Sequence, residues 1–343
     1  MANKNKILHQ AKEAKKDEFY TRREDIEREV YHYRRQFEGK TVLCNCDDPR
    51  VSEFFQYFAL NFEWLGLKRL ICTCYKNNDI DLFSQHDKEQ AVYIIYDGDK
   101  NGNNRIDPEE LDVKPLKGDG DFRSKECIEL LKQSDIVVTN PPFSLFRQYV
   151  KQLTDYNKQF LIIGNQNAIS YKEIFPLIMH NKMWVGYNSG DMSFRVPSDY
   201  EPRETRYWQD KTGQKWRSMG NITWFTNLDT KKRHEELEFY KRYTPEEYPH
   251  YDNYDAIEVS KTQNIPEDYD GVMGVPITFL DKYNPNQFEI LGITDRGNEY
   301  GLKTKEYTKE MVPNAGDLNR RAAYFDNGVL KATYARLLIR KKQ

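Results

Sequence analysis

The stretch that decides the fold is SDIVVTNPPF, residues 134–143. Its run Ile136 to Thr139 lacks the polar alternation of a half-exposed strand, so it predicts a strand buried on both faces. The tetrapeptide Asn140-Pro141-Pro142-Phe143 follows directly at the carboxyl end of that strand. Ligands of open α/β sheets bind outside this end of the strands, so the tetrapeptide is the first candidate site.

Similar apolar runs recur along the first two-thirds of the chain. Strands are expected at 41–45, 69–75, 91–96, 135–139, 160–164, 182–187 and 221–227. A charged helix is expected within 17–38, with Ile26, Val30, Tyr33 and Phe37 on one apolar stripe, and another helix over 50–65. Strands that alternate with helices indicate a parallel sheet. The sequence therefore predicts an α/β fold with a doubly wound, mostly parallel seven-stranded sheet.

Changes in composition predict the domain boundaries. Residues 1–16 are rich in lysine and form a basic N-terminal arm, either solvated or docked on phosphates. Residues 17–230 hold the repeated strands and helices, interrupted by a long polar and aromatic insert over 188–220. Over 231–343 the rhythm stops, and we expect an appended region that ends in a basic strand.

The composition narrows the class of protein. The 343 residues carry a net charge of -2, so any nucleic-acid binding must rest on local patches. No apolar run approaches the roughly 20 residues of a membrane span, and the N-terminus does not resemble a secretory signal. Five cysteines in such a chain indicate reduced thiols and a cytoplasmic location.

Two patterns resemble metal sites, and for both we favour another interpretation. The C-x-C pairs Cys44/Cys46 and Cys72/Cys74 are narrower than the usual zinc spacing and belong to apolar runs. The loop Asp99–Glu110 matches a calcium loop at several positions, but it lacks the central glycine and follows a strand rather than a helix. We therefore predict a polar loop and no metal.

The tetrapeptide suits the methylation of an exocyclic amine. The lone pair of such an amine is delocalised into its ring, and two acceptors on its N–H bonds would localise it. The Asn140 side-chain oxygen and the Pro141 carbonyl can be these acceptors, since the two prolines restrict the backbone between them. Phe143 can stack on an extruded base. The alternative is a proline-rich turn after a buried strand, with Phe143 in the core.

Longer segments carry a family resemblance. The run SDIVVTNPPFSLFRQYV (134–150), together with GDGDFRS (118–124), LCNCDDPRVSEFFQYF (43–58) and GVMGVPITFLDKYNPNQFEILG (271–292), resembles the EcoRI-type adenine-specific DNA methyltransferases of class I fold. The resemblance implies S-adenosyl-L-methionine as methyl donor and a flipped-out adenine of double-stranded DNA as acceptor of the methyl group at N6. It also implies a role in restriction–modification or DNA protection, beside a cognate restriction endonuclease that acts separately.

The resemblance also points to cofactor-binding residues. They are Phe19, Tyr20, Thr21, Asn45, Cys46, Asp47, Asp48, Asp121 and Phe122. Each group has a structural alternative: a staple and cap for 19–21, a helix cap at Asp48, and a turn with a cap for 119–122. The turn at 45–49 has no glycine, unlike that of most methyltransferases, and the acid for the cofactor ribose stays open between Asp79 and Asp81.

Contact with DNA is expected from basic residues interleaved with aromatic ones. The best candidates in the insert are Arg203, Arg206, Lys211, Lys215 and Arg217, beside Tyr207, Trp208 and Trp216. A second cluster comprises Arg320, Arg321, Lys331, Arg336 and Arg340. The alternative is a solvated charged surface. Rival functions are RNA or protein-amide methylation on the same fold, or a DNA-binding homologue without activity.

Overall fold

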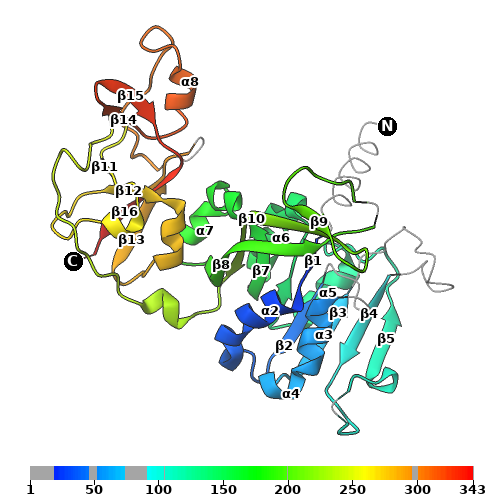
Figure 1. The fold of residues 1–343 in the computed structure, drawn as a ribbon. Coiled ribbons are helices and arrows are strands. Elements are labelled where there is room, and N and C mark those ends of the chain that lie inside the picture. Colours follow the sequence, from blue (N-terminus) through cyan, green and yellow to red (C-terminus); the bar gives the residue numbers. More distant parts are fainter. Residues whose placement is uncertain are drawn as a thin grey trace. The chain divides into compact units, whose positions relative to one another are not determined.

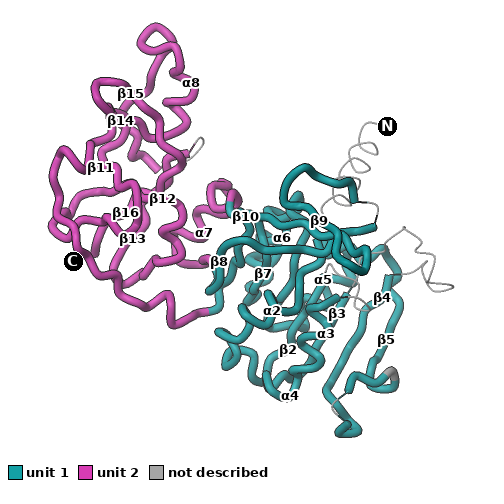
Figure 2. Tube along the Cα trace, in the orientation of Figure 1, with its two compact units in different colours: residues 1–166, 186–228 teal, residues 167–185, 229–343 magenta. Residues whose placement is uncertain are grey.

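The computed structural model describes residues 19–45, 52–73, 91–103, 105–198, 200–295 and 300–342. Its contacts divide the chain into two compact units, one of residues 1–166 and 186–228 and one of residues 167–185 and 229–343 (Figures 1 and 2). The sequence predicts 167–185 within the region of repeated strands and helices, 17–230. This segment belongs instead to the C-terminal unit, where α7 (Phe175–Met179) packs on β13 (Phe288–Ile293).

The first unit is built on a ten-stranded sheet. Along the sheet the order is β1 (Tyr20–Thr21), β8 (Trp184–Arg195), β10 (Lys215–Thr226), β7 (Gln159–Asn165), β6 (Ile136–Thr139), β2 (Thr41–Cys44), β3 (Arg69–Thr73), β4 (Val92–Tyr96) and β5 (Leu111–Pro115), with β9 (Tyr207–Gln209) paired to β10. The prediction of a mostly parallel, seven-stranded sheet is wrong in both number and direction. β3, β2, β6 and β7 run parallel, whereas β4, β5 and β10 join by antiparallel pairing.

Burial explains this mixed sheet. Every residue of β2 and β6 is buried, as parallel strands covered on both faces require. By contrast, four of the five residues of β5 are exposed, and antiparallel strands can face water in this way. β8 and β10 continue well beyond the expected 182–187 and 221–227, into the polar insert, where no apolar alternation marked them.

Helices connect the central strands (Figure 1). They are α2 (Arg23–Val30), α3 (Glu53–Leu60), α4 (Phe62–Leu65), α5 (Lys125–Gln133) and α6 (Phe146–Asp155), with the 3-10 turns η1 (Tyr31–Gln36), η2 (Pro108–Glu110), η3 (Phe143–Leu145) and η4 (Gln166–Ser170). The predicted stripe of α2 and η1 is confirmed, since Ile26, Val30, Tyr33 and Phe37 are at most 1% exposed. Ser52 caps α3, so this helix begins later than the expected residue 50, and the predicted cap at Asp48 lies outside the described residues. Within the described residues, no helix is long and apolar enough to cross a membrane.

The sheet changes direction of growth between β2 and β6. From β2 the chain adds β3, β4 and β5 on one side, and then returns to place β6 and β7 on the other. Right-handed crossovers in opposite directions put α3 and α6 on opposite faces of the sheet. The carboxyl ends of β2 and β6 therefore form a topological switch point, which is the usual ligand site of a doubly wound sheet.

Glu29 of α2 is a fully buried carboxylate in the first unit. Its oxygens accept hydrogen bonds from the Tyr33 hydroxyl (2.9 Å), the Tyr187 amide (2.6 Å), and the Asn188 amide and side chain (2.8 Å each). Burial raises the pKa of Glu29, although these hydrogen bonds oppose the shift. Glu29 thereby joins α2 to β8.

The second unit holds a four-stranded sheet and a hairpin. The sheet order is β11 (Ile257–Glu258), β12 (Met273–Pro276), β16 (Arg336–Lys341) and β13, and the hairpin pairs β14 (Ala323–Asp326) with β15 (Val329–Ala332). Short helical segments complete it: α8 (Ala315–Leu318), η5 (Lys231–His234), η6 (Thr262–Asn264) and η7 (Ile277–Lys282). Asn327 and Gly328 both have positive φ at the hairpin tip, as a tight two-residue turn requires.

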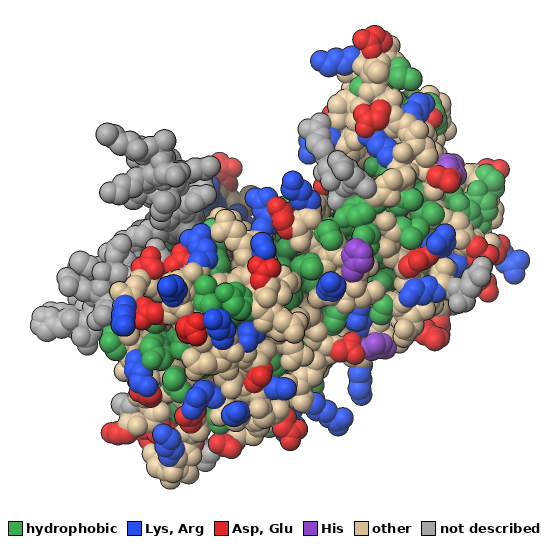
Figure 3. Space-filling model, turned by 180° about the vertical axis from the view of Figure 1, so that it is seen from behind, with side chains coloured by type: hydrophobic (Ala, Val, Ile, Leu, Met, Phe, Trp, Pro, Cys, Tyr) green, Lys and Arg blue, Asp and Glu red, His purple; other side chains and the backbone are tan. Residues whose placement is uncertain are grey.

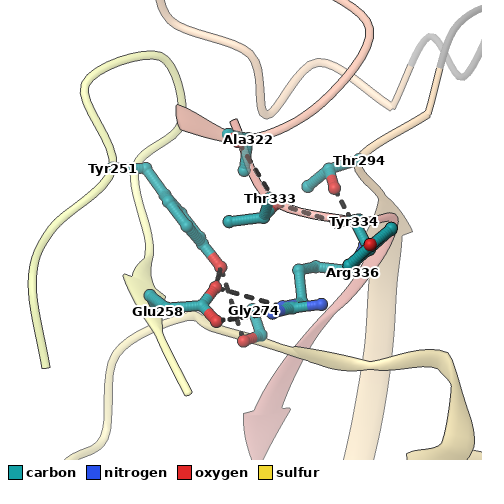
Figure 4. A network of polar contacts seen from close by, with 8 residues as sticks. All are labelled: Tyr251, Glu258, Gly274, Thr294, Ala322, Thr333, Tyr334 and Arg336. Carbon is teal, nitrogen blue, oxygen red and sulfur yellow. Dashed lines mark hydrogen bonds and ion pairs between the residues drawn. The ribbon is translucent and has the colours of Figure 1, made fainter. Parts of the chain in front are cut away.

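A buried ion pair lies in this second sheet (Figure 4). Arg336 Nη2 lies 2.7 Å from Glu258 Oε1, and both side chains are nearly buried. The Tyr251 hydroxyl donates to the same carboxylate, and burial raises the pKa of Tyr251. Arg336 therefore belongs to the interior, which removes it from any surface that could bind DNA.

Candidate active site

Asn140 lies at the switch point, directly after β6, and its side chain is buried. Pro141 is also buried, while Pro142 and Phe143 are half-buried and lead into η3. The Pro142 carbonyl accepts a hydrogen bond from the Leu145 amide (2.9 Å). Within the described part of the chain, no donor reaches the Pro141 carbonyl. The backbone turn thus uses one of the two proline carbonyls and leaves the other available to a ligand.

Polar contacts join the end of β6 to the end of β2. The Thr139 hydroxyl donates to the main-chain carbonyl of Asn45, and the Tyr149 hydroxyl of α6 donates to the Asn45 side chain. The Tyr149 ring in turn meets the buried ring of Phe122 edge-on, at 5.0 Å between centroids. Two candidate cofactor residues are thereby held by one tyrosine. Neither Tyr149 nor Thr139 belongs to a motif that marks it as a site residue, although Tyr149 lies one helical turn beyond Phe146 on the buried face of α6.

The N-terminal segment 19–21 reaches the same site. The Phe19 ring stacks on Phe143 at 5.7 Å between centroids, and its main-chain carbonyl accepts a hydrogen bond from Asn140 Nδ2 (2.5 Å). Tyr20 and Thr21 form β1, which pairs with β8 at the edge of the sheet. The alternative of a staple and threonine cap is wrong, because α2 has Arg22 at its N-cap and no side-chain cap.

A cleft of about 610 Å³ opens beside this segment. Its walls carry both carboxylates and guanidinium groups, and its lining residues include Tyr20, Thr21, Arg23, Glu53, Arg195 and Asp210. The Thr21 hydroxyl is buried, and within the described residues it has no hydrogen-bond partner. A buried hydroxyl without a partner is costly, so this site suits a polar ligand.

The loop before α5 carries the remaining described candidates. Asp121 forms a two-pronged ion pair with Arg123, with Nη2 2.6 Å from Oδ2 and Nε 2.9 Å from Oδ1. Burial acts to raise the pKa of Asp121, but the hydrogen bonds from Arg123 outweigh it and leave this pKa below its usual value. Ser124 caps the helix. The Asp119 carboxylate accepts a hydrogen bond from the Asp121 amide within a turn. The candidates Cys46, Asp47 and Asp48, and Asp79 and Asp81, lie outside the described residues.

The insert contains a hairpin of β9 and β10. Trp208 and Trp216 lie opposite each other in register and their rings stack, 6.4 Å between centroids. At the turn, Asp210 accepts hydrogen bonds from the Thr212 hydroxyl (2.6 Å) and Trp216 Nε1 (2.8 Å). These hydrogen bonds lower the pKa of Asp210 to about 2, and the one from Thr212 has the largest effect. The carboxylate therefore keeps the hairpin turn closed at neutral pH.

Comparisons with known proteins identify the family of the chain. The sequence model of the family described as "Adenine-specific methyltransferase EcoRI" matches residues 7–342, nearly the whole chain.

The chain belongs to this EcoRI family of adenine-specific methyltransferases. It is similar to the Type II methyltransferase M.EcoRI of Escherichia coli, with 52% identity over 84% of the chain and 89% of that relative. It is also similar to the Type II methyltransferases M.MgeORF184P of Mycoplasma genitalium and M.MpnI of Mycoplasma pneumoniae, with 42% and 39% identity over 98% of the chain and at least 98% of each relative. No solved structure was found to match the chain.

Family membership confirms the activity that the resemblance of the longer sequence motifs implied. The protein is an adenine-specific DNA methyltransferase, and the protein-amide alternative falls away.

The basic residues of the methyltransferase's insert differ in their exposure and in their hydrogen-bond and ion-pair partners. Arg203 and Lys211 are exposed, whereas Arg206 forms an ion pair with Asp191 (2.5 Å). The ammonium group of Lys215 donates to the Tyr200 carbonyl (2.9 Å), and Arg217 donates to the Thr205 carbonyl (2.8 Å). Carbonyl contacts fix these two side chains without neutralising their charge.

The second basic cluster is largely committed to carboxylates. Arg321 pairs with Asp295, Arg336 with Glu258, Arg340 with Glu289 and Lys331 with Asp326. On the face seen in Figure 3, basic and acidic side chains are likewise interspersed. The hairpin β9–β10 is therefore the stronger candidate for contact with DNA.

The loop Asp99–Glu110 is closed by its own side chains. The buried carboxylate of Glu110 accepts a hydrogen bond from the Lys100 amide (2.7 Å). The Asp107 carboxylate accepts hydrogen bonds from the side chains of Asn101 (2.7 Å) and Asn103 (2.6 Å). Among the residues that the structure describes, no group of acidic, histidine or cysteine side chains is arranged to hold a metal ion. Cys44 and Cys72 are buried and lie opposite each other in the neighbouring strands β2 and β3.

Proposed function

We propose that this methyltransferase transfers a methyl group from S-adenosyl-L-methionine to N6 of an adenine flipped out of double-stranded DNA. The main support for the proposal is that hydrogen bonds bring three segments together where the strand order changes direction. Thr139, directly before Asn140, donates to the Asn45 carbonyl, and Asn140 donates to the Phe19 carbonyl. The rest of the site follows from the chemistry that an aromatic amine needs.

Asn140 and Pro141 are the residues proposed to orient the amine. The Asn140 oxygen and the Pro141 carbonyl accept the two N–H bonds, which draws the nitrogen towards tetrahedral geometry and localises its lone pair. Pro141 and Pro142 restrict this backbone, so the acceptors are in place before the base arrives. Fixed acceptors of this kind lower the barrier without reorganisation. The amine loses its proton after methylation has made the nitrogen acidic, so no general base is required.

Phe143 is proposed to hold the flipped base. Its ring is half-buried and already stacked on Phe19, so one side is supported while part of the ring stays accessible. Base–aromatic stacking contributes roughly 1–3 kcal/mol. This offsets part of the few kcal/mol that extrusion of a base costs.

S-adenosyl-L-methionine supplies the methyl group when it is bound. Asn45, Cys46, Asp47 and Asp48 after β2, Asp121 and Phe122 before α5, and Phe19, Tyr20 and Thr21 are the residues proposed to hold it. The buried Thr21 hydroxyl without a partner and the mixed charges of the adjoining cleft fit the ammonium and carboxylate groups of its amino-acid end. The Phe122 ring, held against Tyr149, offers an apolar surface for its adenine.

The hairpin β9–β10 is proposed to contact DNA, with Arg203, Arg206, Lys211, Lys215 and Arg217 near the phosphates. The stacked Trp208 and Trp216 stiffen the hairpin. We place the target-recognition elements in 188–220 and 231–343, and a basic arm at 1–16. The enzyme would act in the cytoplasm in restriction–modification, with an endonuclease acting separately.

Sequencing of DNA from a host that expresses the enzyme tests this function. With a modification-sensitive readout, we expect methylated adenine at one short sequence motif, and none in cells that express Asn140→Ala at equal level. Absence of the mark with a folded, expressed wild-type enzyme would contradict the proposal.

A further inference from the structure

The amide of Asn140 has a partner on the side away from the proposed target. Its Nδ2 lies 2.5 Å from the main-chain carbonyl oxygen of Phe19, 121 residues away in the sequence. A carbonyl oxygen can only accept a hydrogen bond, so the NH₂ group must face Phe19. The side-chain oxygen of Asn140 then faces the opposite way.

We propose that the Phe19 main-chain carbonyl is a positioning group that selects the catalytic orientation of Asn140. This inference rests on the proposed function, in which Asn140 accepts a hydrogen bond from the adenine amine. A reversed amide would present N–H to the N–H of the target and would set its oxygen against the Phe19 carbonyl. Both contacts are repulsive, so the Phe19 carbonyl leaves the reactive orientation as the stable one.

The surroundings of Phe19 hold this carbonyl in place. Its ring contacts Phe143 (5.7 Å), Phe194 (5.8 Å) and Tyr200 (6.3 Å). On the other side, β1 pairs with β8, and the Arg195 guanidinium lies over the Tyr20 ring at 5.0 Å. The segment is therefore fixed both by packing and by sheet pairing. The N-terminal segment thus contributes to methyl transfer itself, in addition to its proposed contact with the cofactor.

The variant Asn140→Asp tests the orientation. A protonated carboxyl group can donate to the Phe19 carbonyl and offer its other oxygen to the amine, as the amide does. An ionised carboxylate would set oxygen against oxygen. We therefore expect the single-turnover rate of the variant, divided by the wild-type rate at each pH, to rise as the pH falls. At pH values above the pKa of the new carboxyl group, the ratio should rise about tenfold for each unit by which the pH is lowered.

The control is Asn61→Asp. Asn61 Nδ2 also donates to a main-chain carbonyl, that of Tyr57 (2.9 Å), but it lies outside the site. Its rate should match the wild type at every pH. A ratio for Asn140→Asp that is flat, or that rises with pH, would overturn the inference. An inactive wild type would instead contradict the proposed function, so the two failures are distinguishable.

A second experiment does not depend on the folding of Asn140→Asp. Replacing the Phe19–Tyr20 amide by an ester, through incorporation of the α-hydroxy analogue of tyrosine, weakens the Phe19 carbonyl as an acceptor. We expect the single-turnover rate to fall roughly two- to tenfold, as the loss of part of one hydrogen bond implies, with little change in KM for DNA. An ester at the exposed Arg203–Glu204 bond serves as control. An unchanged rate with the ester after Phe19 would contradict the proposal.

Discussion

Replacing Asn140 by alanine removes the proposed acceptor for the target amine. Asn140 is 8% exposed, so the lost hydrogen bond belongs to a closed site from which water is largely excluded. Loss of one oriented hydrogen bond in such a site costs about 2.7–4 kcal/mol of barrier, or a rate lower by roughly two to three orders of magnitude. The Phe19 carbonyl also loses its partner, which costs on the order of 1–3 kcal/mol of stability.

Single-turnover transfer of a labelled methyl group to duplex DNA measures the first effect, and thermal unfolding measures the second. Cofactor affinity, measured by calorimetry, should change little, since Asn140 is not among the residues proposed to hold the cofactor. Asn61→Ala is the matched control, because it also removes an amide that donates to a main-chain carbonyl. A rate for Asn140→Ala within about threefold of the wild-type rate would show that Asn140 does not orient the target amine, and an equal loss of cofactor affinity would assign Asn140 to the cofactor instead.

Three further predictions concern the base, the DNA and pH. Phe143→Ala should reduce turnover on paired adenine more than on mismatched adenine, where less extrusion energy must be recovered, and Phe143→Tyr should reduce turnover less than Phe143→Ala. Equal losses of turnover on both substrates, with a large drop in melting temperature, would assign Phe143 to the core. The logarithm of DNA affinity should fall linearly with the logarithm of salt concentration, with a slope of about -0.9 per phosphate contacted, whereas a flat response would make the hairpin cations mere surface charge. Because the pKa of Glu29 is raised in the folded state, binding of a proton to Glu29 stabilises the fold. This contribution is fully present at pH values below the ordinary glutamate pKa of 4.5, and it is lost as the pH rises through the folded-state pKa. The difference in free energy of unfolding between wild type and Glu29→Gln, measured in urea from pH 4 to 8, should therefore shrink with rising pH, and a constant difference would contradict the assignment.

The sequence was sufficient to predict the centre of the fold. The strands at 41–45 and 135–139 are short, apolar and buried on both faces, and this pattern has few other interpretations. Their carboxyl ends then located Asn45 and Asn140. The family's motifs gave the chemistry, because Asn140–Phe143 is a local sequence feature whose meaning depends on the strand before it.

The edges of the sheet could not be predicted in the same way. β5 is mostly exposed and carries Asp112 and Lys114, so no buried face marked it as a strand. The outer halves of β8 and β10 are polar, and they are strands because they pair with β1 and β9. Pairing between distant segments determines such strands, and local periodicity does not report it.

Side-chain partners across the sequence were the other gap. Glu29 lies in a helix rich in charged residues, and its contacts with Tyr187 and Asn188 of the distant strand β8 explain its burial. Phe19 had been assigned to the cofactor or to a helix staple, and its carbonyl contact with Asn140 arises from the antiparallel pairing of β1 with β8. The sequence offers the basic residues at 320–340 for contact with DNA, but it does not reveal the carboxylates that pair with Arg321 and Arg340 in the fold.

We propose that N6 of adenine in DNA receives the methyl group at this site, and this proposal can be tested on the product itself. The most direct measurement incubates the purified enzyme with duplex DNA and methyl-labelled S-adenosyl-L-methionine, digests the DNA to nucleosides and identifies the labelled product by mass spectrometry. We expect label in N6-methyldeoxyadenosine, and at least a hundredfold less label with Asn140→Ala. Label in a cytosine nucleoside or at a ring nitrogen of adenine, or full labelling by Asn140→Ala, would contradict it.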